Sequence, residues 1–336
     1  MTVKFIALGL DHRHIYGMTQ HMLNAGAECV GFWSDGRPQP LEGFINRFPD
    51  LHQFQTLGAA LESGAELALI SSKPFERCSL SISSMCQGMD VMTDKPGCIS
   101  KTELDNIKAC VAETGRIWSI NFSERFEVPA VTRASELVAQ GAIGRVVHTA
   151  GLGPHRLNKE TRPDWFFERD AYGGILTDIA SHQIDQFMYF TGSTDAEITH
   201  AFVANYANPQ TPGLQDFGEL SLRSETATGS IRVDWFTPDA LPTWGDGRLT
   251  ILGTEGYIEL RKYIDVEGTK GTDHVILVNG ETIAKSFEEN AELPSFINLI
   301  HDIRNRTETA MTQKHCFKVM ELALEAQARA ERSFAC

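Results

Sequence analysis

The chain has 336 residues, and this length predicts two domains, because single domains usually hold roughly 100 to 200 residues. Hydrophobic residues make up 42% and charged residues 22%, which is the composition of an ordinary globular protein. The formal net charge of −14 would repel a polyanion, so no nucleic-acid partner is expected. A dinucleotide stays compatible with this charge, because backbone N–H groups at a helix N-terminus can hold its phosphates.

The cysteines and the first residues indicate the cellular compartment in which the protein is expected. The seven cysteines are odd in number and contain no C-x-x-C pair, so neither a disulfide scaffold nor a structural zinc site is expected. The apolar run 3–10 leads directly into charged residues and has no cleavage-like segment, so no signal peptide is expected. No run approaches the roughly 18 apolar residues of a membrane span. We therefore expect a cytoplasmic protein without a membrane partner.

The first 122 residues alternate strand and helix signals. Strands are expected at 3–9, 27–33, 67–72, 90–93 and 117–122. Helices are expected at 14–26, at 75–87, and from a capping box at Ser100 and Glu103 to Gly115. Apolar strands that alternate with helices predict a parallel sheet covered on both faces. Residues 1–122 are thus expected to form an N-terminal Rossmann nucleotide-binding domain.

The pattern changes after Phe122. Helices are expected at 129–140, 173–190, 294–304 and 313–332, and a strand at 145–152. Between 197 and 285, β-like runs such as 229–236, 247–253 and 256–261 are separated by Gly, Asn and Thr, which suggests an antiparallel or mixed sheet. The predicted fold class is therefore α/β, with a C-terminal α+β domain at 123–336 for substrate binding and oligomerisation. The terminal helix is a candidate to pack back on the first domain.

The turn after the first strand is the candidate nucleotide loop. The dinucleotide fingerprint is G-x-G-x-x-G, and here only its first glycine, Gly9, is present. Asp11 stands where the backbone should approach the pyrophosphate, and its carboxylate opposes that charge. Arg13 and the N–H groups of the helix could compensate, and His12 belongs to the same cofactor loop. The alternative is a Rossmann-like domain that has lost or weakened its nucleotide.

The residues at the end of the second strand are expected to contact the adenosine ribose. Asp35 would favour NAD by accepting a hydrogen bond from the 2′-hydroxyl, whereas Ser34 with Arg37 would favour the 2′-phosphate of NADP. An ordinary polar turn is a third interpretation, and the sequence leaves all three open.

Asp94, Lys95 and Pro96 close a strand near the carboxyl edge of the predicted sheet, where such folds bind ligands. The proline keeps Lys95 out of a helix, so its ammonium could stabilise negative charge on a substrate oxygen. The alternative is a solvated lysine at a strand end.

The helix after Gly173 and Gly174 carries a second set of polar residues. Asp178 and His182 are four positions apart, so the carboxylate could orient the imidazole for proton transfer. A solvated polar face that includes Asp185 is the alternative, and a metal site of these three residues ranks last because no fourth ligand is obvious.

In this order, the Rossmann start, the Lys-Pro strand end and the Gly-Gly-x-x-x-Asp-x-x-x-His-x-x-Asp helix resemble the Gfo/Idh/MocA family of oxidoreductases. The resemblance extends over nearly the whole chain. It includes the segment of Ser72 and Pro74, which is similar to that after the family's fourth strand and is expected, with Asp94, to contact the cofactor. It also includes the turn at 141–145. Asp94 replaces the glutamate of the family's E-K-P motif, and Asp11 is the clearest departure.

The resemblance implies roles for particular residues. Lys95 would hold the reacting hydroxyl near the nicotinamide, His182 would be the general acid/base, and Asp178 would orient it, while Asp185 would be structural. Arg125 matches an arginine near the crossover between domains and is a candidate to bind the substrate. Four further residues fall in a region that often lines the sugar pocket: His155, Arg156, Arg162 and Trp165.

The activity that follows is hydride transfer between NAD or NADP and a hydroxyl or ketone carbon of a sugar, cyclitol or related polyol, in a homodimer or homotetramer. Three alternatives stay open. They are elimination or glycoside cleavage with transient use of NAD and no net redox, a non-catalytic sugar- or nucleotide-binding protein, and a metal-dependent lyase or isomerase.

Overall fold

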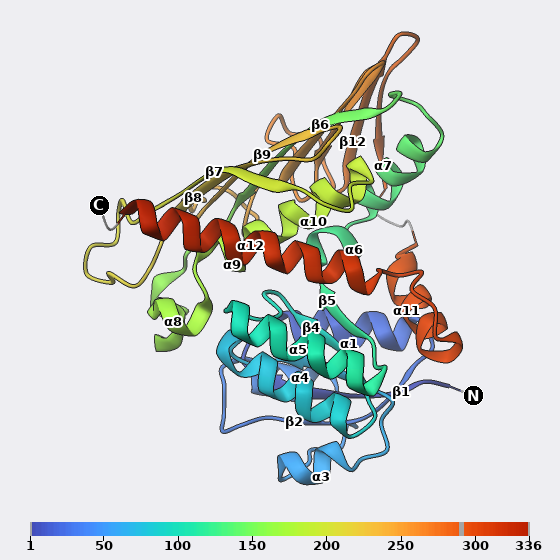
Figure 1. Cartoon of the computed structure of the whole chain (residues 1–336), viewed down its shortest axis with the longest axis vertical. Helices are drawn as coiled ribbons and strands as arrows, with labels where there is room; N and C mark the ends of the chain where they lie inside the picture. The colour runs from blue at the N-terminus through green and yellow to red at the C-terminus, as the bar shows by residue number, and fades with distance from the viewer. Residues whose placement is uncertain (1, 289–291, 335–336) are drawn as a thin grey trace. The chain divides into compact units, whose positions relative to one another are not determined.

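A computed structural model describes residues 2–288 and 292–334 and divides the chain into two compact units (Figure 1). The first unit comprises Met1–Phe122, Asp170–Gly173 and Pro294–Met320. The second unit comprises Ser123–Arg169, Gly174–Leu293 and Glu321–Cys336. No helix in the described part of the chain is both long and apolar enough to cross a membrane.

The first unit is built on the predicted parallel sheet, which has five strands in the order β2-β1-β3-β4-β5. The strands are β1 (Lys4–Leu10), β2 (Glu28–Trp33), β3 (Leu67–Ser71), β4 (Asp90–Asp94) and β5 (Trp118–Asn121). All residues of β3, β4 and β5 are buried, as expected for strands covered on both faces. A parallel bridge between Phe32 and Gln53 adds a rudimentary strand outside β2 and completes the Rossmann order, which reverses beside β1.

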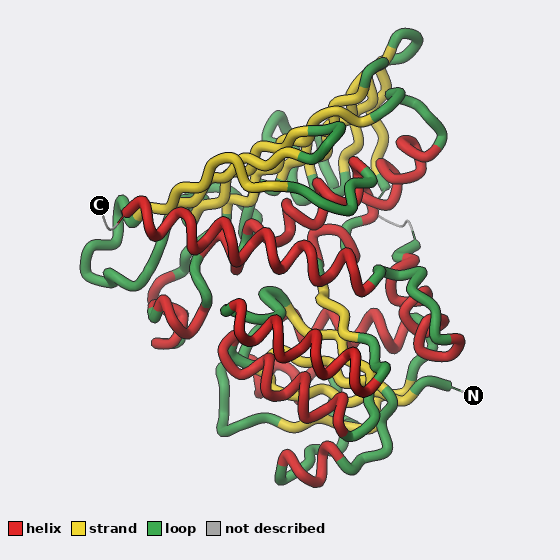
Figure 2. The backbone as a smooth tube through the Cα atoms, in the orientation of Figure 1, coloured by secondary structure: helices red, strands yellow, loops and turns green. Residues whose placement is uncertain are grey.

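Helices cover both faces of this sheet (Figure 2). They include α1 (His14–Asn24), α4 (Arg77–Cys86), α5 (Lys101–Thr114) and α11 (Pro294–Asn305). The chain steps from β1 to β2 in one direction and from β3 through β4 to β5 in the other. Because such crossovers are right-handed, α1 lies on one face and α4 and α5 lie on the other. The carboxyl ends of β1, β3 and β4 therefore meet where the strand order reverses.

The predicted boundaries of α5 are confirmed in detail. The Ser100 side chain accepts from the backbone N–H of Glu103, and the Glu103 carboxylate accepts from the backbone N–H of Ser100 at 3.2 Å. The helix ends at Gly115, whose φ of +64° lies in the left-handed region that favours glycine.

The second unit contains one eight-stranded sheet in the order β13-β12-β11-β10-β6-β9-β8-β7. Its strands are β6 (Val146–Pro154), β7 (Glu197–Ala204), β8 (Phe217–Arg223), β9 (Thr228–Asp234), β10 (Arg248–Gly253), β11 (Gly256–Arg261), β12 (His274–Asn279) and β13 (Ile283–Phe287). Neighbours are antiparallel except β6 and β9, so the predicted mostly antiparallel sheet is confirmed. Buried residues alternate with more exposed ones along β8 and β9, as in a sheet with one covered face.

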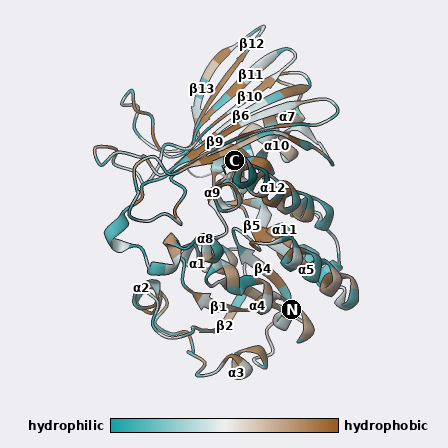
Figure 3. Ribbon diagram, turned by 60° about the vertical axis from the view of Figure 1, so that its left-hand side comes forward, coloured by the Kyte–Doolittle hydropathy of each residue, from teal (hydrophilic) through white to brown (hydrophobic). Residues whose placement is uncertain are grey.

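Helices α7 (Pro129–Ala139) and α10 (Ala180–Thr191) cover that face. α10 packs on β6 and β9, and α7 packs on β11 and β12. A Cβ at Gly151 of β6 would lie 2.7 Å from Cγ of Gln183, so this glycine allows α10 to approach the sheet closely. The terminal helix α12 (Gln313–Phe334) is amphipathic, and hydrophilic and hydrophobic segments alternate along it in Figure 3.

The structure corrects two expectations about helices. The predicted helix at 173–190 is two helices, α9 (Ile175–Asp178) and α10, which are separated at Ile179. The Ser181 hydroxyl donates to the carbonyl of Asp178 at 3.3 Å, and such a bond back to the preceding turn bends helices. Sequence patterns also missed α2 (Pro40–Arg47) and α3 (Leu57–Leu61). The remaining short helical segments are η1 (Pro74–Glu76), α6 (Ser123–Phe126), η2 (Lys159–Thr161), η3 (Asp164–Phe167) and α8 (Arg169–Tyr172).

Candidate active site

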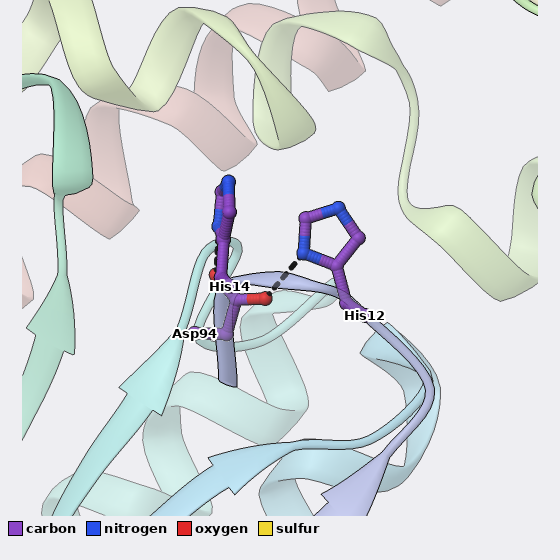
Figure 4. A group of neighbouring side chains, drawn as sticks. All are labelled: His12, His14 and Asp94. Atoms are coloured by element: carbon purple, nitrogen blue, oxygen red, sulfur yellow. Dashed lines mark hydrogen bonds and ion pairs between the residues drawn. The ribbon is translucent and has the colours of Figure 1, made fainter. Parts of the chain in front are cut away.

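The carboxylate of Asp94, the last residue of β4, is fully buried and anchors the carboxyl edge of the parallel sheet. It accepts hydrogen bonds from the backbone N–H of Lys95 (2.8 Å), Nδ1 of His14 (2.8 Å), Nδ1 of His12 (2.8 Å), Oγ of Ser71 (3.1 Å) and Nη2 of Arg77 (3.3 Å). Burial alone would raise the pKa of Asp94, but the charges of His14 and Arg77 and the hydrogen bond from His12 hold it well below its ordinary value. Asp94 is thus an ionised acceptor for both histidines (Figure 4).

The two histidines form a compact pair. Their ring centroids are 4.2 Å apart, and the rings meet edge to face at 81°. Burial, followed by the charge of His14, lowers the pKa of His12 to about 4, although Asp94 opposes that shift. Near neutral pH the His12 ring is therefore neutral, and its bond to Asp94 places the remaining proton on Nδ1.

Arg77 holds the turn that carries Lys95. This buried guanidinium donates to the carbonyls of Ser72 at 2.9 Å and Pro96 at 3.0 Å, and also to the carbonyl of Lys95. The side chain of Lys95 is 5% exposed, so the alternative of a solvated lysine is wrong. Sequence reasoning missed Arg77, because a single arginine at the start of an expected helix gives no sign that it is buried.

The expected nucleotide loop lies against the end of β3. Gly9 has a φ of +68°, and a Cβ there would come within 2.5 Å of the Ser72 Cβ, so the close approach requires glycine. The backbone N–H groups of Asp11 and His12 donate to the Ser71 carbonyl at 3.0 and 3.1 Å. Burial raises the pKa of Asp11 to about 6, even though the charge of Lys73 opposes the shift.

The other residues expected to bind the cofactor lie in the same unit. Ser34 follows β2 and is half-buried, while Asp35 and Arg37 are exposed in the turn after it. Arg13 is exposed at the start of α1, and Pro74 is buried at the start of η1 after β3. All of them therefore lie in segments that follow the carboxyl ends of β1, β2 and β3.

In the second unit, the glycine before α9 allows a tight anchor for that helix. Gly174 has a φ of +85°, and a Cβ there would lie 2.3 Å from Cδ of Gln327. Oε1 of Gln327 accepts from the backbone N–H of Leu176, and Oε1 of Gln215 accepts from that of Ile175, both at 3.0 Å. Side chains thus satisfy two N–H groups that a helix start leaves without partners in the helix.

The polar residues of α9 and α10 are buried, so the alternative of a solvated polar face is wrong for Asp178, His182 and Asp185. These residues are 8%, 2% and 0% exposed. Asp185 forms a two-pronged ion pair with Arg125, with contacts of 2.6 and 2.8 Å. The ion pair supports a structural role for Asp185, whereas the role of Arg125 toward substrate stays a prediction. Within the described residues, the one His/Cys/Asp/Glu group that could hold a metal is His12, His14 and Asp94.

Glu124 is a buried acid that sequence reasoning missed. Its Oε2 accepts from Nζ of Lys262 at 2.5 Å and from Nε2 of Gln183 at 3.0 Å. Burial alone would raise the pKa of Glu124, but the Lys262 ammonium and the nearby His182 and His155 lower it to about 2. No local pattern could join Glu124 to a lysine 138 positions away.

The loop after β6 contains the residues expected to line a sugar pocket. The His155 ring lies 4.5 Å from the Trp244 ring. Arg156 and Arg162 donate to backbone carbonyls at 2.8 and 2.9 Å, so both guanidinium groups shape the loop itself. Trp165 is half-buried. These four residues and His182 belong to the second unit, whereas Lys95 belongs to the first.

Comparisons with known proteins agree with this fold. Residues 131–259 match the family model of the GFO/IDH/MocA C-terminal domain. A crystal structure from Erwinia carotovora atroseptica SCRI1043, described provisionally as an oxidoreductase, is 42% identical and has a TM-score of 0.94. The similarity covers 98% of this chain and 99% of that chain.

Two more distant relatives have named substrates. The scyllo-inositol 2-dehydrogenase (NAD(+)) of Bacillus subtilis is 22% identical over 297 residues, which are 83% of this chain and 81% of that protein. A levoglucosan dehydrogenase, solved in complex with NADH and levoglucosan, shares the fold at 16% identity. Its TM-score is 0.79, with coverage of 99% of this chain and 98% of that chain.

Proposed function

Because the chain belongs to the Gfo/Idh/MocA family of oxidoreductases, we propose that it is an NAD(P)-dependent dehydrogenase or reductase of polyhydroxylated small molecules. The expected reacting group is a hydroxyl or ketone carbon of a sugar, a cyclitol or a related polyol. Two relatives carry names that fit this class, since one is a dehydrogenase of scyllo-inositol and another of levoglucosan.

The first unit is the proposed nucleotide-binding domain. Gly9 and Ser72 lie at the reversal point of the sheet, where dinucleotides bind in this fold, and Lys73 and Arg77 bring positive charge near Asp11. Asp35, or Ser34 with Arg37, would contact the ribose end. The nicotinamide supplies a hydride acceptor or donor when bound. The second unit is the proposed substrate-binding domain.

The proposed chemistry needs two contributions from the chain, a positive charge beside the substrate oxygen and a group that transfers a proton. The Lys95 ammonium would stabilise negative charge on the substrate oxygen, because its turn is fixed by Arg77 and Asp94 and cannot relax away. His182 would take the hydroxyl proton during oxidation and return it during reduction, with Asp178 as its orienting partner. The observation that carries the proposal is the buried, anchored Lys95 at the carboxyl edge of a Rossmann sheet.

Parallel fluorescence titrations with NADH and NADPH test cofactor binding. We expect micromolar-range binding of at least one of them, and weaker binding of the preferred one after Asp35→Ala or Arg37→Ala, whichever residue reads the ribose. Asp11→Gly should tighten binding, because it removes a carboxylate that opposes the pyrophosphate. If neither nucleotide binds wild type or Asp11→Gly, and no cofactor is retained on purification, the proposal fails.

The role of His182 is tested by its replacement with alanine. A general acid/base contributes about 100- to 10,000-fold to a rate, so turnover by His182→Ala should fall by that order while cofactor affinity stays nearly unchanged. His200→Ala is a matched control, since that histidine is exposed in the same unit. Full activity in His182→Ala would contradict the assignment.

The expected assembly and compartment stay predictions. We propose a homodimer or homotetramer in the cytoplasm, and light scattering on the purified chain measures its mass in solution. A monomer at all concentrations would contradict the proposed assembly.

A further inference from the structure

We propose that His12 and His14 form a binding site for a divalent transition-metal ion of the zinc class, with Asp94 as the carboxylate that orients both rings. The inference rests on three side chains of the first unit and does not require turnover, although His12 also belongs to the proposed nucleotide loop. Neither the match to the family nor the named relatives assign a role to this group.

The geometry is that of two rings fixed on one carboxylate. Nδ1 of His12 lies 2.8 Å from one oxygen of Asp94, and Nδ1 of His14 lies 2.8 Å from the other. One candidate ligand atom from each residue can be chosen so that all three lie within 4.8 Å of one another. Figure 4 shows the outer nitrogen of both rings, Nε2, pointing away from the carboxylate.

The chemistry of the donors favours a cation. An ionised carboxylate only accepts hydrogen bonds, so each ring donates through Nδ1–H, and in a neutral ring the lone pair then lies on Nε2. Histidines that bind metals usually donate their other ring N–H to a carboxylate in this way. Imidazole nitrogen is a donor that suits zinc, copper, nickel and iron.

The site is both rigid and accessible. Asp94 cannot easily rotate, because Ser71 and Arg77 also donate to it and its side chain is fully buried. The His12 and His14 side chains are 26% and 31% exposed, so an ion can reach them from solvent. Two protein nitrogens are one fewer than the three protein ligands usual in zinc sites that keep an open position, so water or oxygens of a small molecule would complete the coordination.

Metal titration of the full chain, purified without an affinity tag and stripped with a chelator, tests this inference. We expect one Co²⁺ or Zn²⁺ per chain, with Zn²⁺ displacing Co²⁺. Affinity should fall at least tenfold in His12→Ala and in His14→Ala, and further in the double variant. His200→Ala should bind like wild type, since that histidine is exposed on β7. Equal binding by the wild type and the double variant would overturn the proposal.

Electron paramagnetic resonance of Cu²⁺ bound to the wild-type chain provides a second test that needs no variant to fold. Coupling to two imidazole nitrogens is expected, and a spectrum with one or none would overturn the proposal.

An NADH titration of the same metal-free sample distinguishes failure of the proposed metal site from failure of the proposed dehydrogenase activity. Nucleotide binding without metal binding would reject only the metal site, and metal binding without nucleotide binding would reject only the dehydrogenase.

Discussion

Asp94 shows how one buried side chain can organise a site. Its five donors come from the loop after β1, the start of α1, the end of β3, the residue after β4 and the start of α4, so one carboxylate fixes the nucleotide loop and the Lys95 turn together. The sequence placed Asp94 in a Lys-Pro motif and His12 in a separate loop. Only the sheet order, which sets β1 next to β3 and β3 next to β4, shows that these segments meet.

We predict that Asp94→Ala destabilises the fold by about 3 to 5 kcal/mol, because it leaves the buried Arg77 guanidinium without its carboxylate. Urea unfolding measures the change. Asp105→Ala is the control, because it removes an exposed pair with Lys101 that contributes about 0 to 1 kcal/mol. Equal effects of the two variants would contradict the anchoring role of Asp94.

The Glu124–Lys262 ion pair predicts a pH dependence. The pKa of Glu124 is about 2 in the fold against 4.5 ordinarily, so the native state binds fewer protons than the unfolded chain between these values. Its stabilisation is complete above about pH 4.5 and is lost as the pH falls toward about 2. Unfolding free energies of wild type and Glu124→Gln should therefore converge across that window. Glu160→Gln changes an exposed acid, so its unfolding free energy should stay close to that of wild type across the whole window.

At the scale of elements, the start of α9 depends on a glycine with two separate requirements. Gly174→Ala should destabilise the fold both through its φ of +85° and through the contact of a Cβ with Gln327 at 2.3 Å. Gly26→Ala measures the cost of a positive φ alone, about 1 kcal/mol of unfolding free energy, because Gly26 has a φ of +89° and open space around it. Thermal unfolding should show the larger loss for Gly174→Ala, and equal losses would contradict the contact.

Elements with local signals were predictable from sequence. The Ser100 capping box and Gly115 marked both ends of α5, because a cap is a contact between residues three or four positions apart. The break at Ile179 was not predictable, since apolar periodicity continues through it. A solvated polar face was one interpretation of the polar residues of α10, because periodicity does not show what packs against a helix. Periodicity locates a polar stripe, but the sheet and Glu124 decide that this stripe is buried.

At the scale of the molecule, the order of strands and helices was enough to predict a Rossmann sheet followed by a mostly antiparallel sheet. The order also predicted which strand ends would meet, because parallel strands present their carboxyl ends at one edge. Long-range partners such as Lys262 for Glu124 could not be predicted, since no spacing rule links residues on different elements.

Nucleotide absorbance during turnover tests whether this chain transfers hydride between a nicotinamide and a polyhydroxylated substrate. Wild type and His182→Ala would be incubated with NAD or NADP and a panel of inositols, aldoses and levoglucosan. Reduced nucleotide should accumulate with at least one substrate, and His182→Ala should form it about 100- to 10,000-fold more slowly. Product formation without reduced nucleotide, or no turnover with any member of the panel by a chain that binds the nucleotide, would contradict the proposed hydride transfer.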